Sequence, residues 1–93
     1  MTTYTALFSL GRLLATPMAR EELAELHYSP LDLIRRHMSG DWAEMAIEDQ
    51  ESNREAIIDG SRIFSAYTIQ STKFWVITEA DRSSTTILLP SEY

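Results

Sequence analysis

The residue types best suited to chemistry lie together near the C-terminus, in the segment 77–86. This segment places Glu79, Asp81 and Arg82 among several hydroxyl side chains. The arginine could bind a phosphate or a carboxylate there, and either acid could act as a general base. The same residues also suit a polar hairpin, in which Asp81 caps the turn and Arg82 pairs with a neighbouring carboxylate. The sequence leaves both interpretations open.

Acidic residues form a second concentration, between residues 41 and 59. Seven of them stand there against Arg54, and this stretch alone can account for the net charge of −6. A helix is expected over 48–58, and its period places four carboxylates within one narrow stripe. Three isoleucines on the far side are expected to anchor this helix. The carboxylates are Glu48, Glu51, Glu55 and Asp59, and the isoleucines are Ile47, Ile57 and Ile58.

The acidic stripe has two interpretations. It is either an ordinary solvated helix face or an imitation of nucleic-acid phosphates that lysines and arginines of a partner would bind. A free phosphate backbone would be repelled, so direct nucleic-acid binding is not expected. The expected partner is therefore a host protein, or a protein–nucleic-acid complex, with a basic surface.

Histidine and tryptophan supply the remaining candidates. His27 and His37 are ten residues apart and lie in no HExxH motif, so no metal site is predicted. His37 shares a helix flank with Leu33, which is typical of a partly buried or capping histidine. Trp42 follows a turn and is either a core residue over the sheet or an exposed stacking platform. The chain has no cysteine, so no thiolate site is predicted. Its three glycines are scattered, so no nucleotide-binding loop is predicted either, and no cofactor is expected.

Two cap signals place the helices that must position these residues. Thr16-Pro17 and Ser29-Pro30 each combine a good N-cap with a proline that suits the first helical turn. The buried stripe of the first helix is predicted to be Ala19, Leu23 and Leu26. That of the second is predicted to be Leu31, Ile34 and Met38, with the helix ending at Ser39-Gly40.

Alternating, β-branched and aromatic residues follow Gly60 and predict three strands, at 62–69, 73–79 and 85–89. Residues 4–14 suit either a short strand or a helical turn, and a strand is favoured. The fold class is α+β, one domain over 1–93, with N-terminal helices packed on one face of a C-terminal three- to four-stranded antiparallel β-meander. Both sheet faces are apolar, so the second face should meet the N-terminal segment, another copy of the chain or a partner.

The apolar runs are too short to span a bilayer, and no basic segment precedes them at the N-terminus. A cytoplasmic protein without a membrane partner is therefore expected, and the lack of cysteine suits that compartment.

Much of the chain resembles a known family. The segments that carry the resemblance are 10–17, 36–42, 65–67 and 75–90, the last of which is WVITEADRSSTTILLP. They are similar to a family of small uncharacterised proteins found on bacterial plasmids and integrated mobile elements. The resemblance implies a mobile-element setting and assigns no activity to any residue.

Three functions of different classes remain. The first is a binding protein, similar to anti-restriction or anti-CRISPR inhibitors, that blocks a host macromolecule. Its partner-binding residues would be Trp42, Glu48, Glu51, Glu55, Asp59, Asp81 and Arg82. The second is a small ribonuclease, since helices followed by a meander are also the order of barnase-like and RelE-like folds. Its candidate residues would be His37, Glu79, Asp81 and Arg82. The third is a structural or antitoxin-like dimer that joins through the second sheet face.

Overall fold

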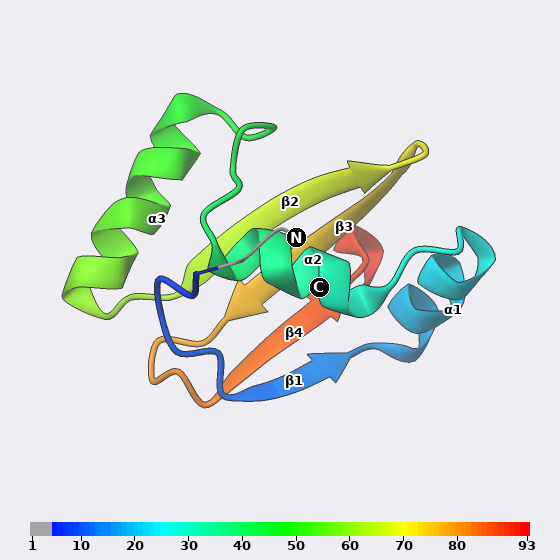
Figure 1. Ribbon diagram of the computed structural model, residues 1–93, viewed down its shortest axis with the longest axis horizontal. Helices are drawn as coiled ribbons and strands as arrows, with labels where there is room; N and C mark the ends of the chain where they lie inside the picture. Colours follow the sequence, from blue (N-terminus) through cyan, green and yellow to red (C-terminus); the bar gives the residue numbers. More distant parts are fainter. Residues whose placement is uncertain (1–4) are drawn as a thin grey trace.

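Four strands form one mixed sheet, and three helices pack on it or beside it (Figure 1). The computed structural model describes residues 5–93. The strand order is β1-β4-β3-β2, and the helices precede β2 in the chain. The elements are β1 (Arg12–Ala15), α1 (Pro17–Glu25), α2 (Pro30–Met38), α3 (Ile47–Asp59), β2 (Ile63–Ile69), β3 (Thr72–Thr78), β4 (Ser84–Leu88) and a final 3-10 turn, η1 (Pro90–Glu92). The predicted α+β class is confirmed.

The two predicted helix caps are present. Thr16 Oγ1 accepts a hydrogen bond from the N–H of Ala19 at 3.2 Å. Ser29 Oγ likewise accepts from the N–H of Leu31 at 3.2 Å. Each proline occupies the first turn, where a missing N–H leaves no helical hydrogen bond unmade. These local signals therefore fix where α1 and α2 begin.

The β2-β3-β4 meander is also confirmed, and both of its links are antiparallel. Gln70 and Ser71 join β2 to β3 in a two-residue turn, and both have positive φ, as a type I′ turn requires. The longer turn between β3 and β4 contains Arg82, which also has positive φ.

The prediction of an all-antiparallel sheet is wrong at β1. This strand pairs parallel with β4, from Arg12 opposite Ser84 to Ala15 opposite Ile87. The favoured strand in the N-terminal segment is present, but it lies only over 12–15, and residues 5–11 are irregular. The first residue of the predicted segment 4–14, Tyr4, lies outside the described residues. Parallel pairing follows because the chain leaves β1 directly into α1 and returns to the same sheet only after three helices.

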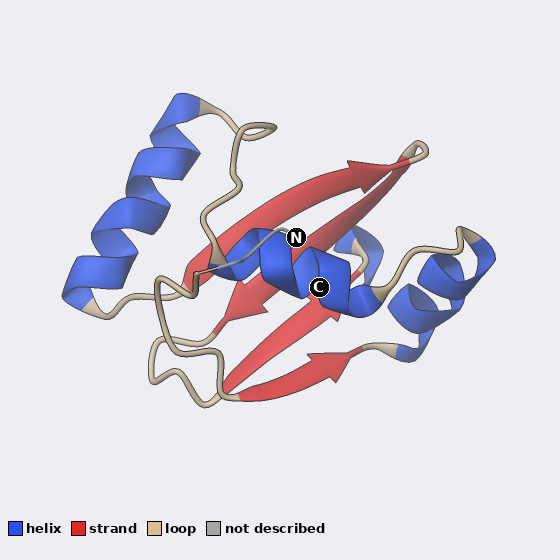
Figure 2. Ribbon diagram, viewed as in Figure 1, coloured by secondary structure: helices blue, strands red, loops and turns tan. Residues whose placement is uncertain are grey.

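The main core lies between the sheet and α1 and α2 (Figure 2), with α2 crossing the sheet. Ala19 and Leu23 of α1 are buried as predicted, and Leu26 is partly buried. The stripe predicted for α2 is wrong in part, since Leu31 is exposed and Met38 only half-buried. Leu33, Ile34 and His37 are the buried residues of α2.

The N-terminal segment does not cover the second sheet face. It crosses the helix-covered face instead, where Phe8 contacts the His37 ring edge-on at 5.2 Å between centroids. Part of the second face is covered by the C-terminal turn. Tyr93 packs edge-on against Trp75 at 5.6 Å, and Trp75 packs against Phe64 at 5.0 Å. The chain thus closes part of this face with its own last residues.

Among residues 5–93, no helix is long and apolar enough to cross a membrane.

Candidate partner-binding face

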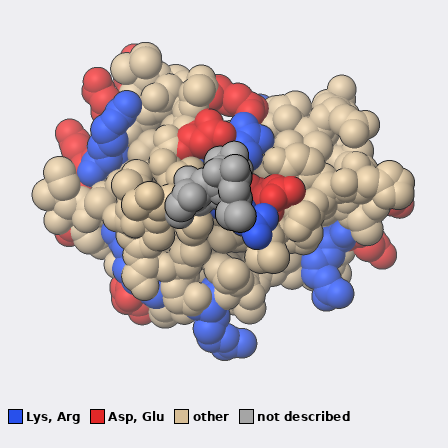
Figure 3. Space-filling view, viewed as in Figure 1, with Lys and Arg blue, Asp and Glu red and all other residues tan. Residues whose placement is uncertain are grey.

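Helix α3 carries the predicted acidic stripe at the edge of the molecule. It packs along β2, and its outer surface faces solvent (Figure 1). All four stripe carboxylates are exposed: Glu48, Glu51, Glu55 and Asp59. Figure 3 shows acidic side chains over the α3 region at the upper left of the view. The stripe therefore lies where a partner could reach it.

Some acids of the chain form ion pairs, and others, among them those of the stripe and Glu21, Glu22 and Glu25 of α1, form none within residues 5–93. Asp41 and Glu44 both bind the guanidinium of Arg36, at 2.8 and 2.6 Å. Glu79 pairs with Arg62 at 3.5 Å. Within residues 5–93, no carboxylate of the stripe forms an ion pair. None of the four is therefore held by a direct ion pair, although hydrogen bonding by Ser61 and, to a smaller extent, the charge of Arg82 lower the pKa of Asp59.

The isoleucine anchor predicted for α3 is wrong. Ile58 is 88% exposed and Ile47 is 63% exposed, while Ile57 is only half-buried. Asn53 and Ala56 are the buried residues of this helix. Asn53 binds β2 through two hydrogen bonds, from its Nδ2 to the carbonyl of Phe64 at 2.6 Å and from the Phe64 N–H to its Oδ1 at 3.1 Å. A polar side chain thus fixes the helix that presents the acids.

The charge density of the stripe can be compared with that of DNA. Its first and last carboxylates are eleven residues apart, which is roughly 16 Å of helix, so one charge occurs about every 5 Å. One DNA strand carries a charge about every 3.4 Å along the axis. The stripe therefore offers somewhat over half the linear charge density of a single strand.

Arg82 lies at the other predicted site, and its contacts are with the main chain of its own molecule. Its Nη1 donates to the carbonyl of Ser61 at 2.7 Å, and more weakly to those of Glu79 and Ala80. Its Nη2 donates to the carbonyl of Ala56 at 3.0 Å. The guanidinium therefore joins the end of α3, the start of β2 and the β3–β4 turn.

Asp81 also acts within this turn. Its Oδ1 accepts the N–H of Ser83 at 2.9 Å, and hydrogen bonding by Ser83, through its side chain first and its N–H second, holds the pKa of Asp81 below its usual value. Asp81 thus caps the turn as the hairpin interpretation expects, whereas the expected pairing of Arg82 with a carboxylate is wrong, since Arg82 binds main-chain carbonyls. A shallow hollow beside it is lined by Glu79, Ala80, Asp81 and Ser83.

We expect replacement of Arg82 by methionine to destabilise the fold by about 2–3 kcal/mol, because the lost bonds leave partly buried carbonyls unpaired. Arg54→Met is the matched control, since Arg54 is exposed and forms no ion pair within residues 5–93. We expect it to change the unfolding free energy by less than about 0.5 kcal/mol. Urea denaturation followed by circular dichroism measures both. Equal effects of the two substitutions would contradict this role of Arg82.

His37 lies in the core, within a chain of buried polar groups. Its Nδ1 is 2.6 Å from Ser65 Oγ, and its Nε2 is 2.8 Å from Thr78 Oγ1. Trp42 Nε1 donates to Ser65 Oγ at 2.7 Å. At the other end, Thr78 Oγ1 is 2.7 Å from Thr85 Oγ1, and Thr85 donates to the carbonyl of residue 10 at 2.7 Å.

The two ends of this chain fix the direction of every bond within it. Thr85 gives its only proton to a carbonyl, so Thr78 must donate to Thr85. His37 Nε2 must then carry the proton that Thr78 Oγ1 accepts. In the neutral ring, Nδ1 therefore accepts the proton of Ser65, which itself accepts from the Trp42 indole. Burial lowers the pKa of His37 to about 3, which agrees with a neutral ring.

This arrangement separates the residues proposed for a ribonuclease. Glu79, Asp81 and Arg82 share one surface turn, whereas His37 is buried with both ring nitrogens bonded to hydroxyl groups. Trp42 is 4% exposed, so it occupies the core position rather than an open stacking surface. Tyr67 is buried as well, under the guanidinium of Arg36 at 4.4 Å from its ring centroid.

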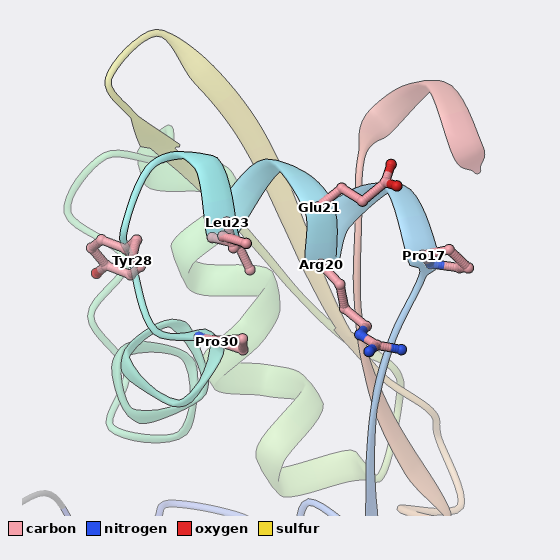
Figure 4. Close-up of a pocket in the computed structure, with 7 residues that line it drawn as sticks. Pro17, Arg20, Glu21, Leu23, Tyr28 and Pro30 are labelled. Carbon is pink, nitrogen blue, oxygen red and sulfur yellow. The ribbon is translucent and has the colours of Figure 1, made fainter.

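A hollow lies between α1 and the start of α2 (Figure 4). Its polar lining is sparse, and Arg20 and Glu21 point in different directions in this view. Within residues 5–93, no group of three or more metal-ligating side chains is gathered.

Comparison with known proteins gave no match to a family model, to a curated protein or to a solved structure.

Proposed function

We propose that this protein binds a basic surface of a host protein, or of a host protein–nucleic-acid complex, through the acidic stripe of α3. The observation that carries the proposal is the exposure of four carboxylates without ion pairs on one helix face. Lysines and arginines that normally hold phosphates would bind these carboxylates instead. The bound protein would then exclude nucleic acid from that surface.

The charge of the stripe predicts how binding should depend on salt. Exposed charges attract over roughly 10 Å at 0.1 M salt, so the stripe would accelerate association and its effect would weaken as salt rises. The isoleucines at the two ends of α3 are exposed and could pack on apolar side chains of the partner, which salt does not screen. We therefore expect a salt-dependent association rate and a less salt-dependent dissociation rate.

The mobile-element setting implied by the family resemblance fits this mechanism. A host defence complex exposes positively charged nucleic-acid channels, and a small acidic protein that occupies such a channel would inhibit it. An anti-restriction or anti-CRISPR role is the form of the proposal that this setting favours.

Two triple variants test the stripe with equal changes of charge. Glu48→Gln, Glu51→Gln and Glu55→Gln remove three carboxylates from α3, while Glu21→Gln, Glu22→Gln and Glu25→Gln remove three from α1. Asp59 is left in place because its Oδ1 accepts the N–H of Ser61 at 2.9 Å. We expect the α3 variant to bind the partner at least 100-fold more weakly and the α1 variant to bind within about threefold of the unmodified protein.

The partner is first captured from nuclease-treated bacterial lysate with the tagged protein and identified by mass spectrometry. Its affinity for both variants is then measured by surface plasmon resonance at several salt concentrations, with a DNA duplex as competitor. Equal losses in the two variants would indicate a general charge effect and contradict the proposal. Unchanged binding by the α3 variant, or failure of DNA to compete, would contradict it as well.

A further inference from the structure

The two edges of the sheet differ in what occupies their main-chain groups. At the β2 edge, Asn53 bonds both the N–H and the carbonyl of Phe64, and Glu44 Oε1 accepts the N–H of Thr68 at 3.1 Å. Side chains thus occupy part of this edge, at Phe64 and Thr68. At the β1 edge, no side chain among the described residues bonds the main chain of Leu13 or Ala15.

The pairing of β1 with β4 shows which groups this edge leaves outward. The N–H of Arg12 donates to the carbonyl of Ser83, and that of Thr16 donates to the carbonyl of Ile87. Alternate residues of a strand bond to opposite sides, so the even positions face β4. The N–H and carbonyl of Leu13 and Ala15 therefore point away from the sheet, as donors and acceptors for another strand.

Apolar side chains surround this edge. Leu13 is 48% exposed and Leu14 is 41% exposed, although both belong to the sheet. Leu31, on α2, is also exposed, and it lines a groove between α2 and β1. The groove is lined by Leu13, Leu14, Ala15, Arg20, Pro30, Leu31, Ile34 and Ile87.

We propose that a second copy of this chain pairs with β1, edge to edge and antiparallel, about a two-fold axis at Leu14. The outward N–H and carbonyl of Leu13 then bond the carbonyl and N–H of Ala15 in the partner. Ala15 bonds Leu13 of the partner in the same way. Leu14 lies opposite Leu14 of the partner, in the position where facing side chains approach most closely. The two sheets join into one, and the exposed leucines of both copies are covered.

Charge complementarity supports a second copy as the occupant. In this register Arg12 lies opposite Thr16 of the partner. Thr16 Oγ1 donates to the carboxylate of Glu92, so that acid stands at the same end of the edge. Each Arg12 therefore meets a Glu92 of the partner, and the two-fold axis makes the pair twice. One surface supplies both halves of the match, as a two-fold interface requires.

The short edge limits the strength of the dimer. Four residues and the leucines beside them bury less surface than a standard interface, so we expect a dissociation constant of roughly 1–100 μM. Sedimentation velocity from 1 μM to 500 μM should show the mass rising from one chain to two. Arg12→Glu should shift this transition at least tenfold upward in concentration, while Lys73→Glu, with the same change of charge on β3, should leave it unchanged.

The lack of cysteine allows a sharper test of the register. Leu14→Cys places two thiols opposite each other, about 4.5 Å apart at Cα, which a disulfide can bridge. Leu13→Cys places them roughly 8 Å apart, beyond a disulfide. Under mild oxidation we expect Leu14→Cys to form the linked dimer at least tenfold faster than Leu13→Cys or the exposed control Lys73→Cys.

A single-chain mass at every concentration would overturn the proposal, and so would Leu14→Cys linking no faster than Lys73→Cys. Faster linking by Leu13→Cys would overturn the register. Circular dichroism of each variant establishes that it is folded. The test does not involve α3, so its result is separate from that of the proposed function.

Discussion

Between pH 7 and pH 5 the protein is expected to lose about 2 kcal/mol of its unfolding free energy, because His37 must stay neutral in the fold. Burial lowers the pKa of His37 from 6.5 to about 3. The unfolded chain therefore binds one more proton than the folded chain between these values. The contribution of neutral His37 to the unfolding free energy is fully present above about pH 6.5. It falls by about 1.4 kcal/mol per pH unit as the pH decreases toward 3.

Geometry gives the same sign. A proton on Nδ1 would leave the Ser65 hydroxyl without its acceptor, inside the core. Urea denaturation at half-unit pH intervals measures the effect, and the range above pH 5 precedes most carboxylate titration. His37→Gln should flatten this dependence, and exposed His27→Asn should keep it. If His37→Gln fails to fold, the NMR signal of the His37 ring in the unmodified protein can be followed against pH instead. A ring that titrates above pH 5 would contradict the expectation that His37 stays neutral in the fold.

Replacing Gly11 by alanine is expected to destabilise the fold by at least about 3 kcal/mol. Gly11 has φ of +65°, and a Cβ there would collide with the carbonyl oxygen of Arg82 and lie 2.5 Å from that of Ser83. Both atoms belong to the main chain, so neither can rotate away. The substitution would force apart β1 and the β3–β4 turn.

Gly60→Ala is the matched comparison. Gly60 has φ of +80°, and a Cβ there would have no heavy atom within 4 Å. It carries only the cost of a left-handed conformation, about 1 kcal/mol. Thermal unfolding should therefore separate the two variants by about 10 °C or more. Similar melting temperatures would show that the contact at Gly11 relaxes easily.

Local chemistry made much of the fold predictable. Thr16-Pro17 and Ser29-Pro30 mark helix starts because the capping side chain and the proline both act on main-chain groups within the next few residues. The alternation in 62–69 and 73–79 predicts a hairpin from neighbouring residues as well. The parallel pairing of β1 was not predictable in this way, since Arg12 meets Ser84 across most of the chain.

The predicted sites show a similar division between surface and core. Helical spacing was enough to place four carboxylates on one exposed stripe, since charged residues stay in water. Apolar spacing did not identify the anchors of α3, whereas in α2 it places Ile34 correctly and Leu31 wrongly. Asn53 and His37 are buried, and their partners lie far along the chain. A signal did exist, since Ser65, Thr78 and Thr85 interrupt the buried phase of apolar strands.

The side-chain cover on β2 has a consequence for how far these molecules can assemble. A sheet with two receptive edges can add copies at both ends and is the repeat unit of a filament. Here the amide of Asn53 and the carboxylate of Glu44 already occupy two of the N–H groups that a second strand would need at β2, those of Phe64 and Thr68. A strand that added at this edge would have to displace both of these side-chain contacts. We therefore expect the contacts of Asn53 and Glu44 to disfavour growth at β2, so that pairing at β1 ends in a finite particle instead of a fibre.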